Sequence, residues 1–146
     1  AMTSSELVST YMEWKELVRI LQPGDLIEFS RDSETSSSHQ HWGVYIGSLP
    51  RGKYQVVHYA EETLAEGIDT GSDALVASLG IIPGKVECAS LKGVVKGGKC
   101  RKNNGWDANA TPLEPSAIVE AAKIMVGEID YNLATNNCEH FAQFCR

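Results

Sequence analysis

The sequence predicts an α+β fold in which a small antiparallel sheet packs against helices. Apolar and polar residues alternate in the runs 25–31, 39–47 and 54–60, which is the period of a half-buried strand. Apolar residues recur every three to four positions in 3–21 and 115–126, which is the period of an amphipathic helix. A length of 146 residues suffices for one ordinary hydrophobic core, so no second core is expected.

The first helical pattern places a single apolar stripe along residues 3–21. Its members are Leu7, Tyr11, Trp14, Val18 and Leu21. We expect an N-terminal amphipathic helix within 1–22, followed by the main domain over 23–146. The stripe is expected to pack on that domain. A helix that docks onto a membrane or a protein partner is the alternative.

Two of the predicted strands carry histidines. In the first strand His41 shares a face with Gly43 and Tyr45, whereas the alternate residues are apolar and are expected to face the core. We expect the His41 face to line a site in which Gly43 leaves room for a substrate. A turn over 48–53 leads into the second strand, and antiparallel pairing would place His58 beside His41.

The middle of the chain is less regular. We expect a loop over 61–84, which either packs in the core or guides lipid chains, followed by a strand over 85–95. One basic cluster lies near Gly97 and Gly98, either as a solvated face or as a contact for anionic lipid headgroups. Its members are Lys92, Lys96, Lys99, Arg101 and Lys102.

The last clear helix is predicted over 115–126. Pro115 suits the first helical position, and Gly127 suits the position that ends the helix. The residues expected to form its buried stripe are Ile118, Val119, Ala122, Met125 and Val126.

A cysteine near the C-terminus lies where a short helix is expected to begin. Asn137 is a favourable N-cap, which would place Cys138 in the first turn of a helix that runs to Phe144. The positive end of the helix dipole favours the thiolate, which is the form that attacks a carbonyl carbon. A small buried thiol without a chemical role is the alternative.

A cysteine nucleophile needs a base, and the base needs a partner that orients it. The two strand histidines, His41 and His58, are candidates for these two roles. His39 lies on the same face as His41, two residues earlier, and spacing alone does not choose between them as the base.

Two sequence motifs carry a family resemblance. HWGVYIG at 41–47 resembles the H-box, and NCEHFA at 137–142 resembles the NC-box, of the lecithin retinol acyltransferase and HRAS-like suppressor group. This group is a branch of the NlpC/papain-like superfamily. The resemblance covers roughly residues 21 to 146, and the pairing of the two motifs is far more specific than either a lone histidine or a lone cysteine.

The resemblance implies roles for three residues: Cys138 as nucleophile, His41 as base and His58 as the third member. It implies a circularly permuted NlpC/papain-like fold in which the nucleophile helix follows the sheet. It also implies phospholipase A and acyltransferase activity on glycerophospholipid acyl esters. The acyl group would form a cysteine thioester and pass to water, an amine or an alcohol.

Two other functions remain open. One is a non-catalytic interaction module, as in some picornaviral proteins with these motifs, and the other is an amide-cleaving cysteine hydrolase. The Ser-rich loop at 32–38 and the N-terminal helix depart from the family pattern, and substrate choice would lie in such loops.

The net charge and the cysteine spacing limit which binding partners and cofactors are expected. A net charge of −6 argues against nucleic acid as the main partner and leaves a phospholipid or membrane surface open. The four cysteines show no CxxC spacing, and the expected chemistry needs neither a metal nor an organic cofactor. No secretory signal and no apolar run of membrane-spanning length is visible, so we expect a cytoplasmic protein, alone or associated with a membrane.

Overall fold

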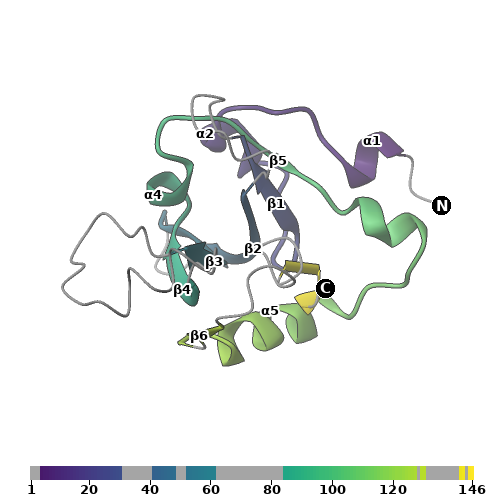
Figure 1. The fold of residues 1–146 in the computed structure, drawn as a ribbon. Coiled ribbons are helices and arrows are strands. Elements are labelled where there is room, and N and C mark those ends of the chain that lie inside the picture. Colours follow the sequence, from purple (N-terminus) through teal and green to yellow (C-terminus); the bar gives the residue numbers. More distant parts are fainter. Residues whose placement is uncertain are drawn as a thin grey trace, which may run out of the picture.

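The computed structural model describes residues 4–30, 41–48, 52–61, 84–127, 129–130, 142–143 and 145–146. Its centre is a six-stranded sheet in the order β5-β1-β2-β3-β4-β6 (Figure 1), and each neighbouring pair is antiparallel. The strands are β1 Leu26–Phe29, β2 His41–Ser48, β3 Tyr54–Glu61, β4 Gly84–Ser90, β5 Cys100–Lys102 and β6 Ile129–Asp130. The predicted α+β class with an antiparallel sheet is confirmed.

Helices cover both faces of this sheet. Figure 1 shows α5, Pro115–Ile124, on one side, and the short helices α2, Trp14–Leu17, and α4, Leu91–Val95, on the other. The buried cluster on the α5 side comprises Leu26, Trp42, Val44, Val57, Tyr59, Val86, Ile118, Ala122, Ala142 and Cys145. The cluster under α2 and α4 comprises Leu17, Ile27, Phe29, Tyr45, Val56, Leu91, Val95 and Cys100.

Residues of β2 alternate between these two clusters, as the sequence pattern predicts. Trp42 and Val44 lie in the cluster on the α5 side, and Tyr45 lies in the other. The face that carries His41 is therefore not an open site along its length, because Tyr45 belongs to a second hydrophobic core. The imidazole of His41 lies at the start of that face.

The continuous helix predicted over 3–21 is wrong. The segment contains two single helical turns, α1 at Ser4–Leu7 and α2 at Trp14–Leu17, separated by extended chain. The extended part pairs with β5, through hydrogen bonds from Met12 N to Cys100 O at 2.8 Å and from Cys100 N to Met12 O at 3.0 Å. This pairing gives hydrogen-bond partners to backbone groups at the outer edge of β5. An isolated helix of that length would also be only marginally stable.

The same N-terminal segment is part of the hydrophobic core. Leu7 is 7% exposed and Leu17 is 0% exposed, and Leu17 lies in the cluster under α2 and α4. The guanidinium of Arg101 lies over the ring of Tyr11, with 4.5 Å from its carbon to the ring centroid. The N-terminal segment therefore packs on the rest of the domain at these residues, as the sequence favours.

The strand predicted over 85–95 ends at Ser90. The Ser90 hydroxyl accepts a hydrogen bond from Gly93 N at 3.1 Å and caps α4. The strands β5 and β6 were not predicted from the sequence, because runs of two or three residues carry no readable period.

The helix predicted over 115–126 is confirmed as α5, with Pro115 in its first turn. Gly127 follows it with φ 96° and donates its N–H to Val86 O at 2.8 Å, which ties the helix end to β4. Val126 was expected in the buried stripe and is instead 43% exposed, because the helix ends at Ile124. Within the described ranges, no helix has the length and apolar character needed to cross a bilayer.

Candidate active site

Two buried imidazoles meet where β2 and β3 pair. His41 opens β2, and His58 lies within β3 opposite Gly43. His41 Nε2 and His58 Nδ1 are 2.8 Å apart, and the two rings meet edge to face with centroids 5.0 Å apart. The side-by-side arrangement predicted for these two histidines is confirmed. Both are nearly inaccessible to solvent, at 6% and 8% exposure.

The hydrogen bond between the two rings links their tautomers. A hydrogen bond between two ring nitrogens requires one to donate and the other to accept. One imidazole can therefore act as proton carrier while the other holds it in place. The geometry of His41 and His58 permits such a division of roles.

The ring of Phe29 packs against the pair. Its centroid lies 5.5 Å from that of His41, since Phe29 and His41 face each other across β1 and β2. A Cβ added at Gly43 would lie 3.4 Å from His58 Cβ and 3.5 Å from Phe29 Cε2. Gly43 therefore makes room for protein side chains, which corrects the expectation that it leaves room for a substrate.

A carboxylate that sequence reasoning missed lies on the strand next to β3, on the same face of the sheet as this pair. Glu87 on β4 is the direct partner of His58 on β3, so the two side chains share a face. Glu87 is exposed, whereas His58 is buried. No sequence signal identifies this neighbour, because the register between β3 and β4 depends on residues that no local pattern connects.

The predicted nucleophile, Cys138, lies outside the described residues, and so does the competing base, His39. Of the C-terminal segment predicted to be helical, Ala142 and Gln143 are described, and both are helical. The loop expected over 61–84 also lies outside the described residues, except for its two end positions.

The three described cysteines differ in accessibility. Cys88 is exposed, whereas Cys100 and Cys145 are both buried, and none of the three is in a disulfide. Burial raises the pKa of Cys145 from 9.0 to about 12, and burial together with the negative charge of Glu13 raises the pKa of Cys100 to about 12. Both buried thiols therefore remain protonated and unreactive at neutral pH.

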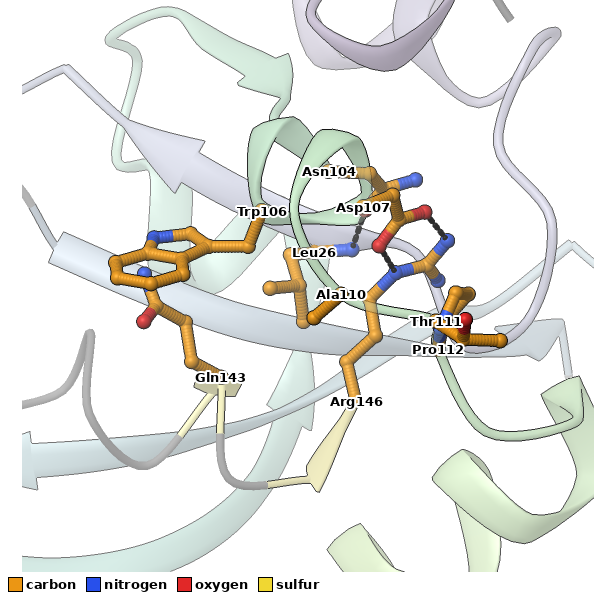
Figure 2. A pocket seen from close by; sticks show the side chains of 9 residues that line it. All are labelled: Leu26, Asn104, Trp106, Asp107, Ala110, Thr111, Pro112, Gln143 and Arg146. Atoms are coloured by element: carbon orange, nitrogen blue, oxygen red, sulfur yellow. Dashed lines mark hydrogen bonds and ion pairs between the residues drawn. The ribbon is translucent and has the colours of Figure 1, made fainter. Parts of the chain in front are cut away.

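A separate hollow of about 220 Å³ lies beside the C-terminus (Figure 2). Neither His41 nor His58 lines it, so it is distinct from the histidine pair. Its wall contains an ion pair in which Arg146 donates to both carboxylate oxygens of Asp107, at 2.9 and 2.6 Å. Arg146 Nη1 also donates to the carbonyl of Gly24 at 2.8 Å. These contacts hold the C-terminus against the start of β1.

The part of the chain that the structure describes contains no group of three His, Cys, Asp or Glu side chains arranged to hold a metal ion.

The chain belongs to the lecithin retinol acyltransferase family, because the family's sequence model matches residues 19–146. It is 36% identical to human phospholipase A and acyltransferase 2 over 125 residues, which is 84% of this chain and 68% of that protein. It is 32% identical to human phospholipase A and acyltransferase 1 over 85% of this chain and 66% of that protein. It is 32% identical to mouse phospholipase A and acyltransferase 3 over 86% of this chain and 70% of that protein.

The chain thus spans about two thirds of the length of these relatives. The family predicted from the H-box and the NC-box is confirmed by this match. Both motifs lie inside the matched region, at 41–47 and 137–142.

Proposed function

We propose that this protein is a thiol-dependent phospholipase A and acyltransferase that cleaves glycerophospholipid acyl esters through a cysteine thioester. The observation that carries the proposal is the 2.8 Å hydrogen bond between the buried imidazoles of His41 and His58. Family membership and the names of the relatives support the choice of phospholipid ester as substrate. The circularly permuted papain-like arrangement, with the nucleophile helix after the sheet, and the cytoplasmic or membrane-associated location are parts of the same proposal.

The proposed roles assign one nitrogen of His41 to each task. Nε2 faces His58, so Nδ1 is the nitrogen that would take the proton of the Cys138 thiol. His41 then carries its own proton on Nε2 and donates it to Nδ1 of His58. This bond fixes the ring of His41 and stabilises the imidazolium that forms when His41 accepts a second proton.

The acylation step breaks the ester and forms the thioester. The thiolate of Cys138 attacks the ester carbonyl, and backbone N–H groups at the start of its helix would stabilise the oxyanion. The tetrahedral intermediate then expels the alcohol of the lysophospholipid, which takes the proton from His41. The products of this step are the acyl-enzyme and a lysophospholipid whose new hydroxyl carries the proton from His41.

The acyl group leaves by the reverse chemistry. Water, an amine or an alcohol gives a proton to His41 and attacks the thioester carbonyl. Cys138 departs as a thiolate and recovers its proton from His41. Water yields a free fatty acid, whereas an amine or alcohol yields the transferred acyl product.

Mass spectrometry of the intact protein tests this proposal. Incubation with phosphatidylcholine vesicles should add one acyl mass, and peptide mapping should place it on Cys138. Cys138→Ala should abolish the adduct, whereas Cys88→Ala, a matched change at an exposed cysteine, should keep it. A protein that forms no adduct would favour the non-catalytic interaction module. An acyl-enzyme formed from amide but not ester substrates would favour the amide-cleaving hydrolase.

Competitive thiol labelling gives a second test that needs no substrate. With dilute iodoacetamide near neutral pH, Cys138 should react first and exposed Cys88 second. Cys100 and Cys145 should stay unlabelled in the folded protein near neutral pH, because both thiols are buried and burial raises their pKa to about 12. Faster labelling of Cys88 than of Cys138 would contradict an activated nucleophile.

A further inference from the structure

Six basic residues lie around α2 and α4, on the side of the sheet that carries the histidine pair. They are Lys15, Arg19, Lys53, Lys92, Lys96 and Lys99, and all are exposed. We call this set the basic surface. It forms in a chain whose net charge is −6, so its sign is opposite to that of the whole protein.

Contacts between elements bring these residues together from three parts of the chain. The helices α2 and α4 contact one another, and Leu17 of α2 and Leu91 of α4 lie in one buried cluster. Figure 1 shows the two helices close together at one end of the sheet. The rings of Trp14 and Tyr54 lie 6.1 Å apart, which places Lys53 beside α2.

The charges of the basic surface are not neutralised within the described ranges. The ion pairs there involve Arg101 and Arg146, and none of the six residues of the basic surface forms one. The described carboxylates on this side are Glu13 and Glu16 at α2 and Glu87 on β4, so cations outnumber anions among the described residues of this region. A cluster of unpaired cations attracts a polyanionic partner.

Apolar groups beside these cations favour a lipid partner over a purely polar one. Ile20, next to Arg19, is 46% exposed, and Trp14 is half-buried with the Lys15 ammonium 5.8 Å from its ring centroid. Tryptophan and long cationic side chains are enriched where a protein meets the headgroup layer of a bilayer.

We propose that the basic surface docks the protein onto bilayers that contain anionic phospholipid. The inference rests on the proposed function, because it names the surface from which the enzyme would reach its substrate. Phe29 connects the two: its ring packs on His41, and it lies in the cluster covered by α2 and α4. Docking through the basic surface would therefore bring the bilayer to the same side of the sheet as the histidine pair.

Vesicle sedimentation of the full chain tests this surface. The Cys138→Ala variant is used throughout, so that binding is measured without turnover. It should bind vesicles of phosphatidylcholine with phosphatidylserine much more tightly than vesicles of phosphatidylcholine alone, and added salt should weaken the binding. Equal binding to both vesicles, or binding that salt does not weaken, would overturn the proposal.

The variant Lys92→Gln/Lys99→Gln removes two charges from the basic surface. Each lysine at an anionic bilayer contributes roughly fivefold in affinity, so the pair should weaken binding on the order of 20-fold. The matched control, Lys85→Gln/Lys123→Gln, removes the same charge away from the basic surface. Lys85 lies at the opposite end of β4 from α4, and Lys123 is exposed on α5. An equal loss in the control would overturn the proposal, since only net charge would then matter.

Two further measurements separate this proposal from its alternatives. Single-stranded RNA that binds through the same lysines more tightly than the phosphatidylserine vesicles would point to nucleic acid and overturn bilayer docking. Thioester formation on a monomeric short-chain phospholipid by the protein with Cys138 intact tests the proposed function alone. Chemistry on the monomer without vesicle binding would reject the basic surface and keep the function. Vesicle binding without any thioester would keep the basic surface as a docking surface and reject the proposed function.

Discussion

Two polar clusters lie against the sheet, one buried and one partly buried, and they differ in what their groups can do. In the first, the rings of His41 and His58 share one hydrogen bond, and an imidazole is a side chain that can take up a proton and pass it on. In the second, Arg146 carries a fixed charge and donates hydrogen bonds to Asp107 and to the carbonyl of Gly24. A guanidinium does not give up its proton in a protein.

The second cluster extends through the start of β1. Asn104 donates to Asp25 Oδ1 at 3.0 Å and accepts from Leu26 N at 2.9 Å, and Asp25 Oδ2 also accepts from Gln22 N at 2.8 Å. Both the nitrogen and the oxygen of the buried Asn104 side-chain amide therefore form hydrogen bonds. A network with this many hydrogen bonds stabilises one arrangement of the chain. The histidine pair, in contrast, can still move a proton. Mutations should therefore separate a cluster for chemistry from a cluster for stability.

The sharpest separation is expected from His41→Gln. If His41 is the base, its loss removes proton transfer, which contributes about 10²–10⁴ in rate. Single-turnover thioester formation on phosphatidylcholine vesicles should fall by that factor. The melting temperature should change little, because the glutamine amide can still bond to His58. A variant that is inactive only because it is unfolded would show up as a lost thermal transition.

Arg146→Met should give the opposite result. It keeps the apolar stem but leaves the carboxylate of Asp107 without its partner, where the two side chains are only 15% and 12% exposed. Breaking such a pair costs about 3 kcal/mol of unfolding free energy, measured by urea denaturation. The rate of thioester formation per folded molecule should be kept.

The double variant Arg146→Met/Asp107→Leu sharpens this test. It removes both charges of this pair. Asp25 Oδ1 lies 3.8 Å from Arg146 Nη1. Asp25 keeps its hydrogen bonds from Asn104 and Gln22 N, so the double variant should recover part of the lost stability. A large fall in single-turnover rate in either variant, at a temperature where it is folded, would show that the two clusters are not separate in function.

The two clusters also differ in whether the sequence could predict them. His41 and His58 are 17 residues apart and lie in adjacent strands of one hairpin, so alternation and a short turn sufficed to bring them together. Asp107 is 39 residues from Arg146, and Gly24 is 122 residues from it. No local period connects such positions, and the second cluster was not predicted.

The N-terminal segment shows a different limit. Both it and α5 have apolar residues at helical spacing, yet only α5 is a full helix. The deciding factor is the unpaired edge of β5, which takes the backbone of Met12 into hydrogen bonds at 2.8 and 3.0 Å. Periodicity identified Leu7 as buried but missed Leu17, which lies outside the predicted stripe. It also could not identify a competing partner for the backbone.

A smaller effect than that of His41→Gln is expected from His58→Asn. His58 is proposed only to orient His41, and an amide can replace part of that hydrogen bond. Residues that orient a functional imidazole are worth about 10–100-fold when the imidazole binds a metal, and we expect a loss in that range here. Thioester formation should remain measurable in the assay used for His41→Gln. If His58→Asn proved the more damaging of the two, His58 would be the better candidate for the base.

The smallest effect is expected from His39→Gln, which tests whether the partner of His58 is chosen correctly. His39 and His41 share a face by spacing alone, but His41 is the residue whose Nε2 lies 2.8 Å from Nδ1 of His58. Since that contact already gives His58 its partner, removing His39 should change the single-turnover rate by less than about twofold, well below the contribution of a general base. His39→Gln and His41→Gln make the same chemical change two residues apart, so each serves as the control for the other. Equal losses in both variants would mean that the 2.8 Å contact does not identify the base.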